Sequence, residues 1–500
     1  MPDLPTITDA RIADLLERVP RSSFVGGSFL GGTPSLDVLD PATGVALTQV
    51  VDADAATIGT RALDAAATAQ DAWAATLPRD RSDILRRAYE LCHERADDLA
   101  LAMTLEMGKP LAESYGEVTY GAEFLRWFSE QAVRAPGEFR HAPSAEHAIL
   151  TVARPVGPVL AITPWNFPLS MGTRKLAPAL AAGCTVVLKP AQMTPLTSLL
   201  LMQILADAGV PEGVVNCVVT SDSKGLSSTL MADSRLRKVS FTGSTPVGRT
   251  LLAQASEHVL KASMELGGNA PFLVLPSADL EVAITAAMPA KFRNNGEACT
   301  AANRFYVHSC VAEEFTRRLV EETEKLVVGP GSEAGTTTGP MIEPAALEKI
   351  EELVADAVHR GAKVLVGGRR PRAEELPAGC ADGFYYLPTV LGDVPPDARV
   401  SREEIFGPVA PIIVMDDVDA MIAAANDTEF GLMSYAIGAD LAEVTDAARR
   451  IESGMVAVNV GVASDAAAPF GGIKESGLGR EGSHEGLAEY LETTYVRLPL

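Results

Sequence analysis

Short apolar runs alternate with long alanine-rich segments along most of the chain. The runs VGPVLAITPWNFP (156–168) and CTVVLKP (184–190) predict buried strands, the first ending at Thr163 and Pro164. Helices are predicted over residues 52–75, 83–107, roughly 168–182 and about 194–208. Strands that alternate with helices in this way indicate an α/β fold with mostly parallel strands.

Two such series divide the chain. The βαβ series from about 156 to 266 is typical of a dinucleotide-binding half, and a second α/β series runs from about 267 to 463. Residues 135–155 and 486–500 fit neither series and predict short strands outside the two cores. Because exposed strand edges need to be covered, these strands are candidate contacts between subunits.

Composition and charge narrow the possible partners. The 500 residues exceed what one hydrophobic core usually supports, and 47% apolar with 21% charged residues is ordinary for a globular protein. The net charge of −23 argues against a nucleic-acid or anionic-membrane partner. A negatively charged substrate would therefore need Arg or Lys side chains within its own binding site.

The cysteines and the N-terminal sequence bear on the compartment. None of the six cysteines belongs to a CxxC pair or to a Cys/His run with zinc spacing, so neither a disulfide scaffold nor a metal site is expected. The first residues do not have the pattern of a signal peptide, and no apolar run reaches the roughly 18 residues of a membrane span. We therefore expect a cytoplasmic protein.

Four segments carry residues that could do chemistry, and each also has a plain structural interpretation. Cys299 in NNGEACTAANR is either a small buried residue or a nucleophile, and Glu265 in MELGGNAP is either a solvated turn residue or a general base in an apolar pocket. Asn166 in TPWNFP could donate to an oxyanion or belong to a structural loop. Gly243 in FTGSTPVG could let a phosphate approach a helix N-terminus or simply make a tight turn.

Seven motifs occur together in the order and spacing of one family. They are TPWNFP, LKP, FTGSTPVG, ELGG, GEAC, EIFGPV and PFGG. In this respect the chain resembles the aldehyde dehydrogenase superfamily over roughly residues 25 to 497. The resemblance implies a Rossmann-like cofactor domain (1–134 and 156–266), an α/β catalytic domain (267–463), oligomerisation strands (135–155 and 486–500) and an active-site loop (464–485).

The same resemblance implies a catalytic set. The thiolate of Cys299 would attack the aldehyde carbon, and Asn166 with the backbone N–H of Cys299 would hold the oxyanion. Glu265 would activate the water that hydrolyses the thioester, and Lys175 would support Asn166 and the path of the proton. A water-activating glutamate implies hydrolysis of the thioester rather than transfer to coenzyme A.

A dinucleotide cofactor, NAD(P), is implied as well. Lys189 and Glu404 are expected to bond ribose hydroxyls, Gly243 and Ser244 to lie near the pyrophosphate, and Phe406 to pack near the nicotinamide. The full expected cofactor set is Thr163, Pro164, Trp165, Lys189, Gln192, Gly243, Ser244, Gly248, Leu266, Gly267, Glu404 and Phe406. Gln192 stands where a glutamate often repels a 2′-phosphate, so NADP is permitted.

Within the superfamily, the chain looks most like succinate-semialdehyde dehydrogenases. Arg174, Arg293 and Ser464 stand where that subfamily binds the carboxylate of its substrate, and Phe470 of PFGG is expected beside them. Two guanidinium groups are suited to a carboxylate in a protein of negative net charge, although surface ion pairs are the plain alternative. The resemblance also implies a homodimer or homotetramer.

Other functions stay open at this level. A semialdehyde longer by one methylene, such as glutarate semialdehyde, would change only the length of the pocket. A cofactor-free thiol esterase or a non-catalytic protein on the same fold are alternatives from other classes. Besides Gln192, the chain departs from the subfamily in two places. Ala301 replaces a second cysteine, which predicts the absence of a redox-switch disulfide. Glu297 and Ala298 replace the usual neighbours of Cys299, and Glu297 has no assigned role.

Overall fold

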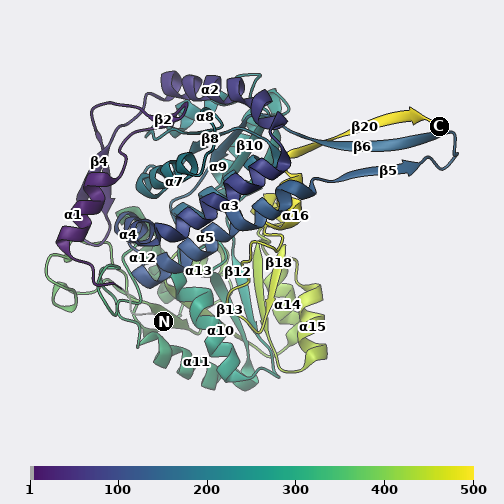
Figure 1. Cartoon of the computed structure of the whole chain (residues 1–500). Helices are drawn as coiled ribbons and strands as arrows, with labels where there is room; N and C mark the ends of the chain where they lie inside the picture. Colours follow the sequence, from purple (N-terminus) through teal and green to yellow (C-terminus); the bar gives the residue numbers. More distant parts are fainter. Residues whose placement is uncertain (1–4) are drawn as a thin grey trace.

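Two large mixed β-sheets organise the computed structural model, which describes residues 5–500 (Figure 1). The first sheet contains, in spatial order, β19 (Gly477–Leu478), β11 (Lys261–Glu265), β10 (Lys238–Thr242), β7 (Val159–Ile162), β8 (Val186–Lys189), β9 (Val215–Cys217), β1 (Phe24–Val25) and β2 (Ser28–Phe29). The second contains β14 (Lys363–Val366), β15 (Thr389–Gly392), β16 (Val409–Met415), β13 (Ala302–His308), β12 (Ala270–Val274), β17 (Met433–Ile437) and β18 (Met455–Val458). The predicted α/β class is confirmed. Residues 1–4 of the expected cofactor domain lie outside the described residues.

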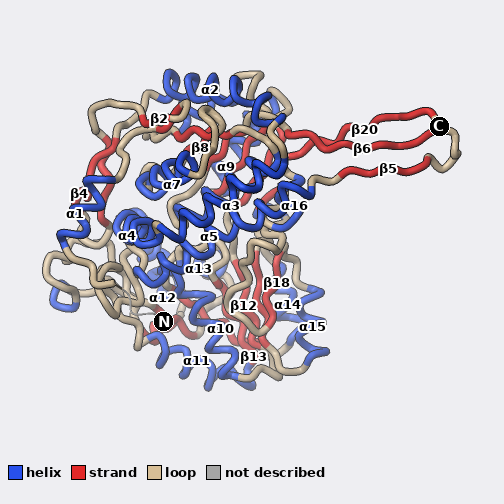
Figure 2. Tube along the Cα trace, viewed as in Figure 1, coloured by secondary structure: helices blue, strands red, loops and turns tan. Residues whose placement is uncertain are grey.

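Helices cover both sheets (Figure 2). Those before and within the first series are α1 (Asp9–Arg18), α2 (Ala55–Ala75), α3 (Pro78–Glu94), α4 (Ala96–Met107), α5 (Leu111–Gln131), α6 (Pro168–Ala182), α7 (Pro195–Asp207), α8 (Ser223–Met231) and α9 (Thr245–Glu257). Those of the second series are α10 (Leu280–Phe292), α11 (Ser309–Thr323), α12 (Pro344–His359), α13 (Arg399–Arg402), α14 (Val418–Asn426) and α15 (Leu441–Arg450). No helix within residues 5–500 is long and apolar enough to cross a membrane.

The strand register of the first sheet brings several chain segments to one edge. Strands β7, β8, β10 and β11 are parallel, and Ile162 is level with both Lys189 and Phe241, while Thr242 is level with Glu265. Their carboxyl ends therefore meet, which is where open α/β sheets bind ligands. The short strand β19 pairs antiparallel with β11 and places the 464–485 segment beside the same edge.

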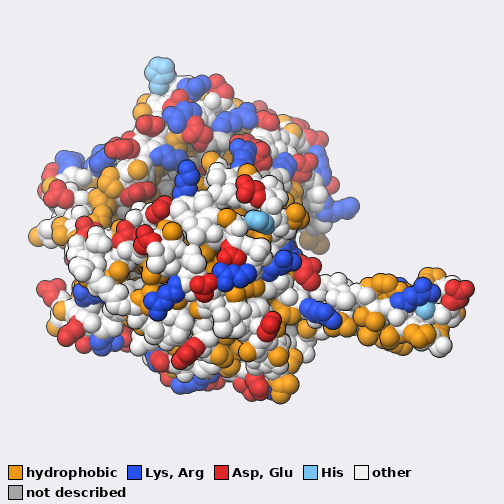
Figure 3. Space-filling model, turned by 90° about the horizontal axis from the view of Figure 1, so that it is seen from above, with side chains coloured by type: hydrophobic (Ala, Val, Ile, Leu, Met, Phe, Trp, Pro, Cys, Tyr) orange, Lys and Arg blue, Asp and Glu red, His pale blue; other side chains and the backbone are white. Residues whose placement is uncertain are grey.

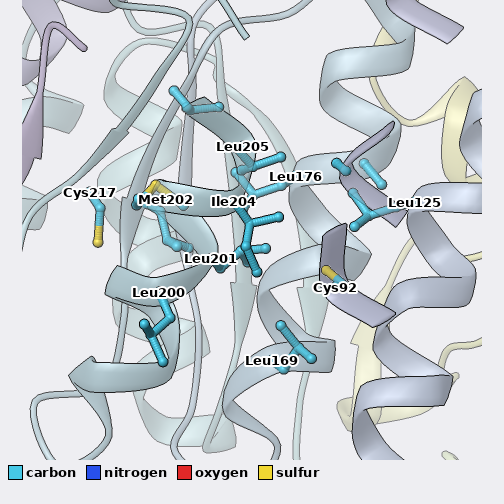
Figure 4. Packing of buried hydrophobic residues seen from close by; sticks show 14 of the residues in the cluster. Cys92, Leu125, Leu169, Leu176, Leu200, Leu201, Met202, Ile204, Leu205 and Cys217 are labelled. Atoms are coloured by element: carbon cyan, nitrogen blue, oxygen red, sulfur yellow. The ribbon is translucent and has the colours of Figure 1, made fainter. Parts of the chain in front are cut away.

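Helix α6 is the central helix of the larger core. All fifteen of its residues are buried, and Leu176 packs among apolar side chains of neighbouring helices that include Leu125 and Leu201 (Figure 4). Pro168 starts this helix, and Gly183 ends it in the left-handed conformation that glycine adopts without strain. The charged residues Arg174 and Lys175 are therefore enclosed within a protein interior.

Two local expectations differ from the structure. The stretch 83–107 is not one helix: α3 and α4 are separated at Arg95, whose φ of −110° and ψ of 22° break the helix although no Gly or Pro marks the position. The tail does not begin as a strand at 486, because α16 (Ser483–Ala488) extends into it. Leu487 and Tyr490, one helical turn apart, are both buried in the larger core, which favours the helical conformation.

A three-stranded antiparallel sheet projects from the body as an arm (Figures 1 and 2). It consists of β5 (Gly137–His141), β6 (His147–Pro155) and β20 (Leu491–Pro499), with β6 in the middle. The strands expected outside the two cores are thus found together. The remaining strands, β3 (Leu36–Asp40) and β4 (Val45–Val50), form a separate hairpin-like pair.

Candidate active site

The segment that carries Cys299 is held in an unusual backbone path. Asn294, Asn295 and Gly296 have φ angles of 53°, 56° and 73°, a region that Asn and Gly tolerate best. The side-chain amide of Asn295 fixes the path, because it donates to the carbonyl of Pro340 at 2.7 Å and accepts from the backbone N–H of Gly339 at 2.8 Å. Cys299 follows this kink and lies just before β13.

Asn166 lies against the same segment. Its side-chain nitrogen donates to the carbonyl of Glu297 at 3.0 Å, and its own carbonyl accepts from the buried ammonium of Lys109 at 2.8 Å. An amide nitrogen carries two hydrogens, so one remains available beyond the bond to Glu297. Asn166 and Cys299 line one cavity, which is the arrangement required for an oxyanion donor beside a nucleophile.

Glu297 has a structural contact rather than a place at the reacting atoms. Its side chain is buried, and one carboxyl oxygen accepts from the backbone N–H of Ile342 at 3.2 Å. Burial raises the pKa of this carboxyl well above its ordinary value, so a neutral acid is favoured at this position. With its carbonyl bound by Asn166, Glu297 anchors the loop two residues before the nucleophile.

Glu265 is not a solvated turn residue. It ends β11, its side chain is buried, and neither carboxyl oxygen has a hydrogen-bond partner among the described residues. Burial raises its pKa well above the ordinary value, and the nearby Glu481 raises it further, while Arg174 and Lys175 act in the opposite direction. A buried carboxyl group with a raised pKa is suited to accept a proton near neutral pH.

Lys175 lies in a buried charge cluster and does not reach Asn166. Its ammonium donates to Glu481 at 2.6 Å and to the hydroxyl of Ser240 at 3.1 Å, while the Nε of Arg174 lies 3.0 Å from the other oxygen of Glu481. Although burial opposes ionisation, Lys175 and Arg174 hold the pKa of Glu481 below its ordinary value. The expectation that Lys175 supports Asn166 needs correction, because Glu481 binds this ammonium and Lys109 is the lysine that contacts Asn166.

Two arginines whose charges act on Cys299 have unused donors. Arg174 is buried, its guanidinium carbon lies 3.7 Å from the ring centre of Phe470, and its Nη2 has no hydrogen-bond partner among residues 5–500. The Nε of Arg293 is also buried without a partner in the described chain. Burial raises the pKa of Cys299 to about 12, and the charges of both arginines act to lower it. Both guanidiniums are thus close to the candidate nucleophile.

A cavity of 430 Å³ is lined by Cys299 and by most of the expected cofactor residues. Trp165 and Phe406 meet edge to face there, with ring centres 5.5 Å apart. Glu404 lines the cavity and accepts from the backbone N–H of Gly268 at 3.0 Å, and burial raises the pKa of this carboxyl. The lining residues from the expected cofactor set are Pro164, Trp165, Gly243, Ser244, Leu266, Gly267, Glu404 and Phe406.

Other expected cofactor residues lie outside that lining. Lys189 ends β8, and burial lowers the pKa of its ammonium to about 8. The backbone N–H of Thr163 donates to the carbonyl of Lys189 at 3.1 Å, and Gln192 is exposed. Packing explains the glycine at position 248, because an added Cβ would lie 2.5 Å from the side chain of Leu266.

Comparison with known proteins identifies the family. The aldehyde dehydrogenase family model matches residues 30–496. The chain belongs to the aldehyde dehydrogenase family. It is 54% identical over 435 residues to a succinate-semialdehyde dehydrogenase of Paenarthrobacter nicotinovorans, a match that covers 87% of this chain and 95% of the relative. It is 46% identical to a glutarate-semialdehyde dehydrogenase of Pseudomonas aeruginosa, over 96% of this chain and 97% of the relative.

The fold agrees with that membership. The crystal structure of an Escherichia coli NADP-dependent enzyme superposes with a TM-score of 0.93 at 44% identity and covers 98% of this chain and 99% of its own. The chain is therefore an oxidoreductase of the aldehyde dehydrogenase family. In residues 5–500 no group of three or more His, Cys, Asp or Glu side chains is placed to hold a metal ion.

Sequence reasoning missed three buried charged residues of this aldehyde dehydrogenase site. Lys109 forms a buried ion pair with Glu117 at 2.6 Å, and Glu481 binds Arg174 and Lys175. Lys109 and Glu117 stand eight residues apart in a stretch without a periodic pattern, and Glu481 is one carboxylate in a glycine-rich loop. Only the three-dimensional contacts single them out, because a buried charge requires a partner that can be distant in sequence.

Proposed function

We propose that the protein oxidises succinic semialdehyde to succinate with NAD(P)⁺. The observation that supports this substrate is the pair of guanidinium groups beside Cys299, each with a buried N–H donor that lacks a partner. Leaving a buried donor unsatisfied is costly, and a carboxylate is the acceptor that a guanidinium binds best. The high identity to a succinate-semialdehyde dehydrogenase also supports the proposal.

The roles of the chain's own groups follow from the site. The sulfur of Cys299 attacks the aldehyde carbon to form a thiohemiacetal, whose oxyanion accepts hydrogen bonds from Asn166 and the backbone N–H of Cys299. After oxidation to the thioester, Glu265 accepts a proton from the attacking water, and the product acid leaves. Arg174 and Arg293 hold the substrate carboxylate through these steps and thereby orient the reacting carbon.

The cavity has the donors that a dinucleotide requires. Ser244 precedes α9 without capping it, so N–H groups at this helix start remain for a phosphate, and the buried hydroxyl of Thr242 has no partner in the described chain. Glu404 offers a carboxylate for hydroxyl groups. NAD(P)⁺ bound there would supply the acceptor for the hydride. We propose that NADP is accepted because Gln192 carries no negative charge.

Glutarate semialdehyde is the second candidate. The relative from Pseudomonas aeruginosa with that name is 46% identical over nearly the whole chain, so the same site plan supports a longer substrate. One methylene is worth about 1–3 kcal/mol in a fitted pocket, which gives a clear preference when both aldehydes are compared.

The direct test is steady-state turnover of succinic and glutaric semialdehydes with NAD⁺ and with NADP⁺. The reduced cofactor is followed by absorbance and the product acid is identified by NMR. The proposal predicts succinate as the product and the higher kcat/KM for succinic semialdehyde. A higher value for glutaric semialdehyde selects the second candidate, and no turnover of either aldehyde contradicts both.

We further propose that the arm joins subunits into a homodimer or homotetramer. Every residue of β5 is exposed, and apolar side chains extend along the arm, with Phe139 64% and Tyr495 53% exposed (Figure 3). Unpaired edges and exposed apolar side chains on a projecting sheet favour coverage by another chain. Sedimentation analysis tests this, and a monomer at micromolar concentration contradicts it.

The proposed compartment is the cytoplasm. All six cysteines, including Cys299, are free thiols in the structure. Reducing compartments keep thiols in this state, which a cysteine nucleophile requires. Fractionation of the producing cells, with activity recovered outside the cytoplasmic fraction, contradicts this assignment.

A further inference from the structure

A second hollow, of 560 Å³, lies between α5 and the 464–485 segment. Tyr120 of α5 and Ser464 both line it, and it shares no lining residue with the 430 Å³ cavity. Ser464 was expected to contact the substrate carboxylate, whereas Tyr120 belongs to neither the catalytic nor the substrate-binding set. The hollow thus brings Tyr120 beside Ser464, a residue expected to bind the substrate.

The hydroxyl oxygen of Tyr120 is buried and has no hydrogen-bond partner of good geometry among residues 5–500. The ring of Tyr120 packs edge to face on Phe124 at 5.1 Å, and the guanidinium carbon of Arg174 lies 5.5 Å from the centre of that same Phe124 ring. Phe124 therefore contacts both Tyr120 and Arg174. A buried hydroxyl without a partner is unusual in a native protein and indicates that a partner arrives.

The electrostatics agree with this placement. Burial raises the pKa of Tyr120, so the hydroxyl keeps its proton at neutral pH, while Arg174, the neighbouring Ser464 and Arg293 act to lower the pKa. In return, Tyr120 and Glu481 raise the pKa of Arg174 although burial opposes this. The two arginines with unused donors therefore act electrostatically on the unused hydroxyl.

We propose that Tyr120 is a specificity residue whose hydroxyl donates a hydrogen bond to the carboxylate of the substrate, between Arg174 and Arg293. This inference rests on the proposed function, because the acceptor is the ω-carboxylate of the aldehyde. A carboxylate has room for about four hydrogen bonds, so two guanidiniums leave an acceptor position for a hydroxyl. Binding of the substrate satisfies a donor that is otherwise buried without a partner.

The test replaces Tyr120 by Phe and measures kcat/KM for succinic semialdehyde and for butanal, which has a similar chain and no carboxylate. Tyr115→Phe is the matched control, because Tyr115 lies on the same helix and its hydroxyl donates to Asp97 on the surface. In Tyr120→Phe, the ratio of the two kcat/KM values is expected to fall about 10- to 100-fold, as for a hydrogen bond to a charged group. The loss is expected mainly in KM, because the carboxylate does not react.

The outcomes separate this inference from the proposed function. A wild-type enzyme without preference for succinic semialdehyde contradicts the proposed function and this inference with it. A wild-type preference that Tyr120→Phe leaves unchanged overturns the inference alone. An equal fall of the ratio in Tyr115→Phe assigns the effect to helix α5 and also overturns the role of the Tyr120 hydroxyl.

Discussion

The cavity beside Cys299 and the buried charge cluster around Arg174 are built differently. The cavity is lined by Gly243 and Ser244, where backbone N–H groups are available. Glu404 is the one carboxylate of the expected cofactor set in this lining. The charge cluster has buried ions that depend on each other, with Glu481 between Arg174 and Lys175. Backbone donors suit a cofactor that many enzymes share, whereas placed guanidiniums distinguish one substrate from another. In the proposed function, the cavity sets the reaction class and the arginines set the substrate.

The largest effect is expected when Cys299, the proposed nucleophile, is removed. Cys299→Ala is expected to lower kcat by roughly 10⁶-fold, as for loss of a nucleophile elsewhere, with every aldehyde and either cofactor. Cys310→Ala is the matched control, because Cys310 is an exposed free cysteine that does not line the cavity. Steady-state rates decide the matter, and turnover by Cys299→Ala at the wild-type rate refutes the assignment.

We expect Glu265 to control the second half of the reaction. Glu265→Gln is expected to lower kcat by about 10²- to 10⁴-fold, while a first turnover of reduced cofactor persists in rapid mixing. The pKa of Glu265 lies well above its ordinary value because it is buried, and only the ionised form accepts a proton. In the wild type, kcat should therefore fall as the pH drops through that raised pKa, above the range of a solvated carboxylate. A pH-independent kcat in that range contradicts the role.

The arginines should affect only the recognition of the substrate. Arg174→Ala is expected to lose roughly 2–5 kcal/mol in kcat/KM for succinic semialdehyde, the range for truncating one member of a buried charge pair. Arg293→Ala is the cleaner variant, because Arg174 also binds Glu481 and its loss leaves that carboxylate less well compensated. Both variants should change kcat/KM for butanal far less. Equal losses with the two aldehydes would remove the arginines from the specificity account.

The smallest effect is expected at Gln192, the residue proposed to face the cofactor's 2′-position. Gln192 is exposed, so a Gln192→Glu charge would repel a 2′-phosphate by about 1 kcal/mol and shift preference toward NAD by about fivefold. The ratio of kcat/KM with NADP to that with NAD, measured at low salt, reports this shift. An unchanged ratio places the 2′-position away from Gln192.

The sequence predicted what depends on local pattern. The strand before Thr163, the helix over 168–182 and the turn at Gly243 follow from short apolar runs and from Pro and Gly at fixed places, and the structure contains all three. The break at Arg95 was not foreseen, because it depends on a direction change that packing imposes and no residue type marks.

The site shows the same division. Cys299, Asn166 and the lining of the cavity were recognisable from motifs, because each stands in a short stretch with its own backbone requirements. The partner of Lys175 could not be recognised from a motif. Glu481 lies more than 300 positions later in the chain and meets the lysine only where the 464–485 segment pairs with β11. Long-range ion pairs leave little trace in one sequence, because either partner alone reads as a surface charge.

One measurement tests the central claim, that two guanidiniums with unused donors beside Cys299 select a carboxylated aldehyde. It is the ratio of kcat/KM for succinic semialdehyde to that for butanal in the wild-type enzyme with a saturating cofactor. The account predicts a ratio of about 30 or more, which corresponds to the lower limit of about 2 kcal/mol for one buried charge pair. A ratio near one would show that neither arginine recognises the substrate and would contradict the account.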